Sequence, residues 1–292
     1  MSQIKLDKIS TTAPKKLDKK KIMKENESMI AKIQLYQQKL FAVSEKSMLI
    51  VLQWLDASGK DGVVKYIFSG MNPLGTRACS FRVPTKEEFS HDFLRRIHKQ
   101  CPEKWMVQVF NRSHYEDILV PTVNNLLPKE EIEKRYSHIN DFEKLLHDTW
   151  TTVLKFYLHI SKEKQKEKLN ERLTDSTKYR KHKIWDRETR KDYDEYMDVY
   201  ENIFNKCNTK ERHIISADQN WYKIYQIAKT ILKAFEDMDL KWPKLSIDQE
   251  TLLLKTKAEL FKSKEQTKIE KERMKKEEEI RKNSTIKKVP KK

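Results

Sequence analysis

Five short hydrophobic runs recur along the chain, and polar segments with helical spacing of apolar residues separate them. The runs are MLIVLQW (48–54), ACSFRV (78–83), WMVQVF (105–110), TTVLKFYLHI (151–160) and HIIS (213–216). Short apolar runs rich in β-branched residues predict buried strands. Because the strands alternate with helices, the pattern predicts an α/β fold with a doubly wound, mostly parallel sheet.

Helices are predicted from apolar spacing and from capping signals. Residues 25–46 carry apolar positions at near-helical spacing. Thr85, with Glu88 three residues later, is a capping-box signature and predicts a helix that runs to about Gln100. Further helices are expected at 128–147, at 161–173 and at about 219–236.

The first run leads into LDASGKDG (55–62), which is typical of a phosphate-binding loop. In such a loop, the N–H groups of a helix N-terminus and a lysine ammonium face the anion. Gly59 and Lys60 fit the usual spacing, but Trp54 stands at the first glycine position and Asp61 at the Ser/Thr position. The spacing alone leaves a second interpretation open, an ordinary strand-to-helix turn with a surface lysine.

Two carboxylates, Asp56 and Asp61, accompany this loop. They would repel a phosphate unless a metal lay between them. Mg²⁺ prefers oxygen ligands and is commonly held by one or two carboxylates together with substrate phosphates. The carboxylates therefore favour the phosphate-binding interpretation and predict Mg²⁺ as cofactor.

A second polar cluster, NRSHYEDIL, directly follows the third run. It places several polar groups together, namely Asn111, Arg112, Ser113, Glu116 and Asp117. Ligands of open α/β sheets bind beyond the carboxyl ends of the strands, so we expect this cluster and the loop to face one crevice. The alternative is an N-capped helix with charged residues.

The densest basic cluster of the central region lies at 178–200, and the overlapping stretch at about 175–195 holds few aliphatic residues. A segment that cannot bury apolar area tends to be mobile until a ligand neutralises it. The segment is therefore predicted to be a helical lid that closes over phosphates. A membrane or nucleic-acid patch and a solvated linker are the alternatives.

Most of the net charge of +17 lies near the two ends of the chain. Residues 1–24 carry +6 and residues 262–292 carry +7, which leaves +4 for residues 25–261. We expect 1–24 to be a disordered basic tail, 25–261 to be the folded domain and 262–292 to be a charged helix or tail. The tails alone do not discriminate among nucleic acid, an anionic membrane and another polyanion.

Neither a membrane span nor a disulfide framework is expected. The chain has no run of about 18 apolar residues and no apolar segment after its basic N-terminus. The three cysteines, Cys79, Cys101 and Cys207, are far apart and lack CxxC spacing. They are typical of reduced thiols in a cytoplasmic protein.

Six motifs in fixed order resemble the type-2 polyphosphate kinase family, a P-loop kinase group related in fold to thymidylate kinase. They are LDASGKDG (55–62), SGMNPLG (69–75), HDFLRR (91–96), FNRSHYED (110–117), VLKFYLHISKEKQ (153–165) and ISADQNWY (215–222). The resemblance runs from about residue 25 to 260. The acidic residues after Tyr115 are similar to those of the subgroup that phosphorylates both nucleoside mono- and diphosphates.

This resemblance implies reversible transfer of the terminal phosphoryl group of inorganic polyphosphate to ADP or AMP, with Mg²⁺ as cofactor. GDP and GMP are further candidate acceptors. A homo-oligomer, either a dimer or a tetramer, is expected, whereas nucleic-acid and membrane partners are not. Two alternatives stay open: an ATP-dependent nucleoside monophosphate kinase of the same fold, and a catalytically decayed polyanion-binding protein.

The resemblance also assigns roles to single residues. The implied catalytic residues are Asp56, Lys60, Asp61, Arg112 and Glu116. Asp56 would hold Mg²⁺ together with Asp117 and would help to orient the acceptor phosphate, and Glu116 would lie near the acceptor. The implied phosphate-binding residues are Ser58, Gly59, Lys60, Gly62, Arg96, Arg112, Lys181 and Arg190, the last two in the lid.

Three features depart from the family pattern. Trp54 replaces a residue that is usually Gly or Ala, so its ring is expected to narrow the loop. Arg180 stands where the lid usually has Trp, so a stacking role is lost or passes to Trp185. The stretch after NRSHYED is shorter than usual. These departures affect the expected nucleotide preference and rate, not the expected chemistry.

Overall fold

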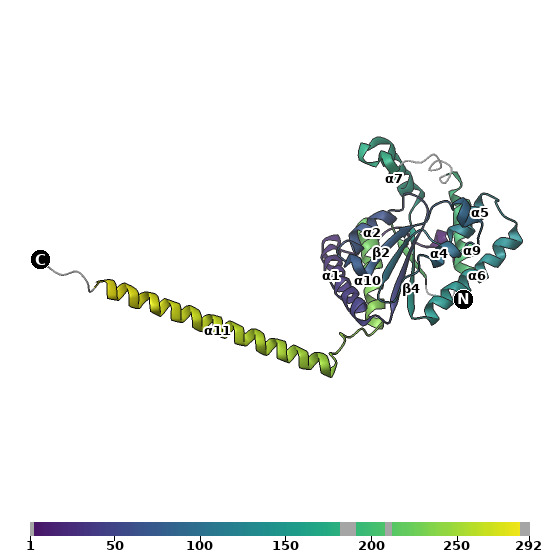
Figure 1. The fold of residues 1–292 in the computed structure, drawn as a ribbon. Helices are drawn as coiled ribbons and strands as arrows, with labels where there is room; N and C mark the ends of the chain where they lie inside the picture. Colours follow the sequence, from purple (N-terminus) through teal and green to yellow (C-terminus); the bar gives the residue numbers. More distant parts are fainter. Residues whose placement is uncertain (1–2, 182–190, 208–211, 287–292) are drawn as a thin grey trace. The chain divides into compact units, whose positions relative to one another are not determined.

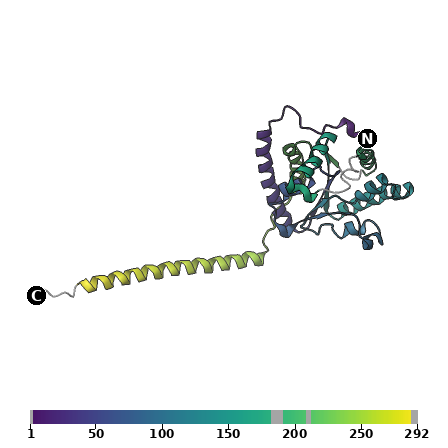
Figure 2. The ribbon, with the colours of Figure 1, turned by 90° about the horizontal axis from the view of Figure 1, so that it is seen from above.

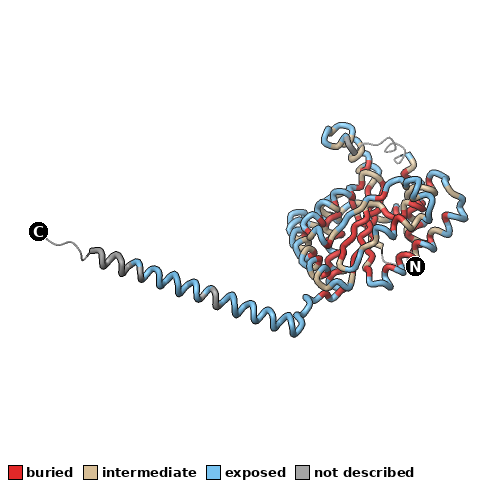
Figure 3. The backbone as a smooth tube through the Cα atoms, viewed as in Figure 1, coloured by how far each residue is buried: buried red, intermediate tan, exposed pale blue. Residues whose placement is uncertain are grey.

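The computed structural model describes residues 3–181, 191–207 and 212–286. The chain divides into two compact units, Met1–Trp242 and Pro243–Lys292. The second unit contains helix α11 (Ile247–Ile286), drawn as a ribbon in Figure 2, and its described residues are exposed (Figure 3). The domain limit expected at residue 261 therefore lies inside α11, and the structure places the boundary at Trp242 instead.

A parallel sheet forms the centre of the first unit (Figure 1). Its described strands are β1 (Ser47–Gln53), β2 (Thr76–Ser80), β3 (Val107–Asn111), β4 (Thr151–His159) and β5 (Arg212–Ser216). Their order is β2-β3-β1-β4-β5, and each neighbouring pair is parallel. All five overlap the predicted runs, although the ends of the strands and of the runs differ. Each residue of the central strand β1 is buried, as expected for a strand that helices cover on both faces.

Helices cover both faces of this sheet, which confirms the doubly wound α/β architecture (Figure 1). One face carries α1 (Lys19–Val43), α2 (Lys60–Phe68) and α10 (Asn220–Asp237). The other face carries α5 (Glu116–Val123), α6 (Lys129–Asp148) and α9 (Tyr193–Lys206). After β4 the chain continues into α7 (Lys162–Thr174) and the 3-10 helix η3 (Ser176–Lys181). The remaining short elements of the described chain are η1 (Leu6–Lys8), η2 (Pro73–Gly75), α3 (Lys86–Phe89) and α4 (Arg95–His98).

The N-terminal segment packs against the rest of the first unit, in contrast with the disordered tail expected for residues 1–24. Leu6 is 2% exposed, and its N–H donates to Glu201 Oε1 over 2.8 Å. The Thr11 hydroxyl donates to Asp218 Oδ2 over 2.8 Å. The Asp18 carboxylate accepts hydrogen bonds from the first turn of α1, so this helix begins at Lys19. Lysines dominate the segment, but the few residues between them make these contacts.

The helix expected from Thr85 to Gln100 is divided into two short ones. The capping box is confirmed, because Thr85 N donates to Glu88 Oε2 and Glu88 N donates to Thr85 Oγ1. Asp92 Oδ1 then accepts hydrogen bonds from Leu94 N and Arg95 N, each 3.0 Å long. Asp92 thus forms a local side-chain turn between the end of α3 at Phe89 and the start of α4 at Arg95.

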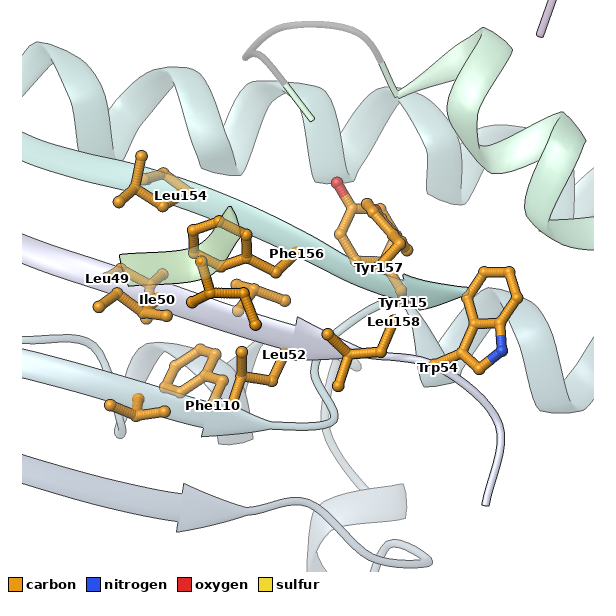
Figure 4. Close-up of a cluster of buried hydrophobic side chains, with 14 of the residues drawn as sticks. Leu49, Ile50, Leu52, Trp54, Phe110, Tyr115, Leu154, Phe156, Tyr157 and Leu158 are labelled. Carbon is orange, nitrogen blue, oxygen red and sulfur yellow. The ribbon is translucent and has the colours of Figure 1, made fainter. Parts of the chain in front are cut away.

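The core lies between the sheet and its two helix layers, where the buried residues gather in Figure 3. Figure 4 shows Leu49, Ile50 and Leu52 of β1 beside Phe110 of β3 and Phe156 of β4. None of the described helices has the length and hydropathy that crossing a membrane requires. Because the core packs on both faces of the sheet, the loops at the carboxyl edge of the sheet lie on a rigid, buried base.

Candidate functional site

The loop between β1 and α2 takes its shape from two residues in the left-handed region. Ala57 has φ 69° and Gly59, the residue before α2, has φ 86°. Glycine adopts this conformation without the penalty that a Cβ brings. Gly59 also carries no side chain to cap the helix, so the first-turn N–H groups of α2 are left for another acceptor.

Lys60, the first residue of α2, is buried rather than on the surface. Its side chain is 7% exposed, and its Nζ donates to Trp54 O over 2.7 Å and to Leu55 O over 2.9 Å. Burial, followed by the positive charge of Arg112, lowers the pKa of Lys60 to about 8. The interpretation as a turn with a surface lysine is therefore wrong.

Arg112 connects the end of β3 to the loop after β1. Its Nη2 donates to Asp56 Oδ1 over 2.6 Å, and its Nη1 lies 3.4 Å from Glu116 Oε2. Arg112 itself has φ 66°, and its backbone N–H donates to Leu52 O of β1. The charges of Glu116 and Asp56 together raise the pKa of the guanidinium. Arg112 is thus a fixed positive charge between two carboxylates from different elements.

Glu116 is held in place by hydrogen-bond partners that the sequence reasoning missed. Gln53, the last residue of β1, donates from Nε2 to Glu116 Oε1 over 2.5 Å and to the Tyr200 hydroxyl over 3.3 Å. The Ser113 hydroxyl donates to Gln53 Oε1 over 3.1 Å. Gln53 is a polar residue at the end of an otherwise apolar strand, and this pattern could have marked it as part of the site.

Asp61 belongs to the same place, because Asn111 Nδ2 donates to Asp61 Oδ1 over 2.9 Å. The structure therefore brings together all the predicted catalytic residues at the carboxyl ends of the adjacent strands β1 and β3. They are Asp56, Lys60, Asp61, Arg112 and Glu116. This is the switch point of the sheet, where open α/β folds bind their ligands.

A buried ion pair anchors the segment that carries Arg112 and Glu116. Lys155 Nζ of β4 lies 2.7 Å from Glu143 Oε2 of α6, and both side chains are fully buried. The Tyr115 hydroxyl donates to Glu143 Oε1 over 2.5 Å. Because Tyr115 lies directly before α5, this network fixes the start of that helix.

Arg96 and Asp117, predicted to bind phosphate and metal, form an ion pair with each other. Arg96 Nη2 lies 2.9 Å from Asp117 Oδ2, and both side chains are largely buried. Arg96 Nη1 also donates to Arg82 O over 2.9 Å, and Arg135 Nη1 donates to Asp117 O over 2.7 Å. Burial raises the pKa of Asp117, although Arg96 opposes this shift. A metal at Asp117 would have to share its carboxylate with this guanidinium.

The remaining predicted phosphate-binding residues fall into two groups. Ser58 is buried within the loop, and Gly62 lies in the first turn of α2. Lys181 ends η3, but its side chain lies outside the described residues. Arg190 lies outside them altogether, as do Trp185 and the central part of the predicted lid, residues 182–190.

Trp54 is 1% exposed and belongs to the core (Figure 4). Its ring stacks on Tyr200 of α9, with centroids 4.6 Å apart and an interplanar angle of 15°, and it also packs against His159 of β4. These two partners hold the ring against α9 and β4. The structure thus gives the ring a position in the core, in contrast with the expectation that it narrows the loop.

A cavity of about 580 Å³ lies beside Arg112, Glu116 and Asp117. Its wall combines aromatic side chains with basic ones, namely Phe81, Phe89, Phe93, Arg82, Lys134 and Arg135. Concave sites of this size, mostly apolar with a few placed polar groups, are typical of small-ligand sites. The cavity and the loop thus meet at Arg112 and Glu116.

The parts of this site are those with which P-loop kinases position a phosphoryl group: a loop lysine, a helix N-terminus and an arginine held across a switch point. The fold and the site therefore define a P-loop phosphotransferase. Residues 16–243 match the family model described as polyphosphate kinase 2, and the chain belongs to this family. The match ends next to the boundary between the two units.

Individual relatives agree with the family match. The chain is 40% identical over 220 residues to "AMP/ADP-polyphosphate phosphotransferase" of Meiothermus ruber, with 75% of this chain and 82% of the relative covered. It is 32% identical over 240 residues to "ADP-polyphosphate phosphotransferase" of Rhodopseudomonas palustris, with coverages of 77% and 83%. The crystal structure of polyphosphate kinase 2 from Arthrobacter aurescens TC1 superposes with a TM-score of 0.82 at 36% identity and covers 87% of this chain and 93% of that one. The predicted family, fold class and enzyme class are confirmed.

Proposed function

We propose that the protein transfers the terminal phosphoryl group of inorganic polyphosphate to AMP and to ADP, in a reversible reaction. One observation carries this proposal: the structure brings four side chains together at the carboxyl ends of β1 and β3, namely Asp56, Lys60, Arg112 and Glu116. The relative from Meiothermus ruber, whose name includes both AMP and ADP, supports the acceptor range. GDP and GMP are further candidate acceptors.

Phosphoryl transfer passes through a loose transition state, so catalysis depends mainly on positioning and on neutralising charge. Lys60 supplies an ammonium at the loop. Arg112 supplies a fork of N–H donors, which suits phosphate oxygens. In the free protein Asp56 and Glu116 occupy this fork. On binding, a phosphoryl oxygen would take over part of it and would leave the carboxylates to orient the acceptor.

The cavity beside Glu116 is the proposed acceptor site. It borders Arg112, so an acceptor phosphate can reach the transferring group while its nucleoside occupies the cavity. Phe81, Phe89 and Phe93 offer apolar and stacking surface for a base. This placement agrees with the role predicted for Glu116 near the acceptor.

Mg²⁺ is the proposed cofactor, and the donor set fits it. Transferases of this family generally need a divalent metal. The described residues hold no cluster of three or more His, Cys, Asp or Glu side chains that could bind a metal by themselves. Mg²⁺ does not need such a cluster, because it takes one or two carboxylates and completes its shell with phosphate and water. Asp56 is the proposed protein ligand, and Asp117 could join it only by sharing its bond with Arg96. The bound metal would neutralise phosphate charge.

Four further predictions stay proposals. Lys181 and Arg190 are proposed to close over the phosphates as parts of the lid. The protein is proposed to be cytoplasmic and to assemble as a dimer or tetramer, which light scattering of the purified protein would test. Nucleic acid is not an expected partner, and salt-resistant retention on DNA would contradict this.

A donor screen tests the proposal. Purified protein with Mg²⁺ and polyphosphate is given AMP, ADP, GMP or GDP in turn, with no other nucleotide present. We expect ATP from ADP, and ADP followed by ATP from AMP. A parallel assay supplies ATP as the donor in place of polyphosphate. Phosphorylation of AMP in that assay, and none with polyphosphate, would instead identify a nucleoside monophosphate kinase.

A further inference from the structure

Lys223, in the first turns of α10, lies against the phosphate-binding loop although it is distant in sequence. Its side chain is 3% exposed, and its Nζ donates to Ser58 O over 3.1 Å. A Cβ placed on Gly59 would lie only 2.6 Å from this Nζ. The ammonium therefore packs directly against the Ser58–Gly59 turn, and the absence of a side chain at Gly59 makes room for it.

The charge of Lys223 is not balanced by a neighbouring carboxylate within the described chain. None of the ion pairs formed there includes it, and its hydrogen bond goes to a neutral carbonyl. Burial and the positive charges of Lys168, Lys60 and Lys164 lower its pKa to about 8. On α7, by contrast, Lys164 pairs with Glu167 and Lys168 pairs with Glu171.

Buried charges are costly and are normally paired. A lysine that served only to hold a carbonyl could be replaced by a neutral donor at less cost. Here two buried ammonium groups, Lys60 and Lys223, flank the same short loop. An anion that supplies negative charge would stabilise this arrangement, and a polyanionic phosphate chain is the anion that this site is proposed to bind.

We propose that Lys223 is a second phosphate-site lysine, a positioning residue that holds the Ser58–Gly59 turn and whose charge is balanced by the bound polyphosphate donor. This inference rests on the proposed function. Lys223 acts through the loop and adds positive potential behind it. The Ser58–Gly59 turn does not line the acceptor cavity, so Lys223 is not expected to affect binding of the acceptor.

The test compares Lys223→Met with Lys233→Met in the full-length protein. Lys233 is an exposed residue of the same helix and is the matched control. Five quantities are measured for each protein: the KM for polyphosphate, the KM for AMP, the KM for ADP, the Tm of the free protein, and the rise in Tm on adding polyphosphate with Mg²⁺.

We expect Lys223→Met to raise the KM for polyphosphate about tenfold, which corresponds to about 1.4 kcal/mol, and to leave the KM for both nucleotides nearly unchanged. The Tm of the free variant should stay equal or rise, because an unpaired buried charge is removed. Its rise in Tm with polyphosphate should be smaller than that of the wild type. Lys233→Met should behave as the wild type does.

Two results would overturn the inference. One is a wild-type KM and a wild-type response to polyphosphate in Lys223→Met. The other is a lower Tm of the free variant with equal losses for donor and acceptors, which would show a merely structural role. Wild-type protein that neither binds polyphosphate nor uses it would refute the proposed function as well, whereas an active wild type with an unaffected variant refutes only the role of Lys223.

Discussion

At the scale of single residues, the site depends on charges held in low-dielectric surroundings. Lys60 has two carbonyl partners in the loop after β1, and Arg112 has two carboxylate partners, one in that loop and one in α5. The identity of these residues was predictable because their types and spacing suit phosphate chemistry. Lys223 was not, because a helical lysine resembles an ordinary surface residue until the fold buries it.

Asp56→Asn should lower kcat by orders of magnitude and leave the fold intact. The change removes a proposed metal ligand and weakens the bond to Arg112, while the side chain keeps its size. Steady-state kinetics with polyphosphate, together with the Tm, would check this. Asp141→Asn, at an exposed position of α6, is the control. Wild-type turnover in folded Asp56→Asn would refute the assignment.

The value of kcat/KM for polyphosphate should fall as the pH rises through about 8. Burial lowers the pKa of Lys60 and of Lys223 to about 8, so both are charged below this pH and neutral above it. Since kcat/KM reports the ionisation of the free enzyme, the loss should approach at least about tenfold per pH unit well above 8. A flat profile between about pH 7 and 9.5 would show that these ammonium groups do not bind the donor.

At the scale of the elements, the strands were predictable and the helix ends less so. Runs such as 48–54 are apolar because β1 is covered on both faces, and this requirement leaves a clear pattern. Where the helix expected at 85–100 is divided, the Asp92 side chain bonds to the backbone N–H groups of Leu94 and Arg95. A local hydrogen bond of this kind leaves no periodic pattern in the amino-acid sequence.

The link between α4 and α5 should contribute strongly to stability. Arg96→Met would leave the Asp117 carboxylate buried without its guanidinium partner, which costs about 3–5 kcal/mol in comparable pairs. Urea unfolding would measure the loss in the free energy of unfolding. The double variant Arg96→Met with Asp117→Asn should recover much of it, because no charge is then left unpaired. Equal losses in the single and double variants would contradict this account.

At the scale of the whole molecule, catalysis is expected to belong to the first unit. The family match covers residues 16–243, and α11 forms part of the second unit. Composition alone suggested that both ends of the chain were tails. It failed at the N-terminus because the contacts of Leu6 and Thr11 join residues about 200 positions apart, and neither side of such a contact has a sequence signal.

Two truncated chains test separately what each end of the protein contributes to stability and turnover. A chain that stops at Trp242 should keep the Tm of the first unit and its turnover on short polyphosphate. A chain that starts at residue 25 should lose several degrees of Tm, because it lacks buried Leu6 and the Asp18 cap. Thermal unfolding and the coupled assay would check both. Inactivity of the folded chain that ends at Trp242 would place part of the site in the second unit.

The central claim is direct transfer from polyphosphate to a nucleotide at the Lys60 loop. It is tested by incubating ³²P-labelled polyphosphate with unlabelled AMP and Mg²⁺, and separating the products for the wild type and for Lys60→Met. The account predicts label in ADP and then in ATP with the wild type, and almost none with the variant. Label that appears only as free orthophosphate, or equal transfer by Lys60→Met, would contradict it.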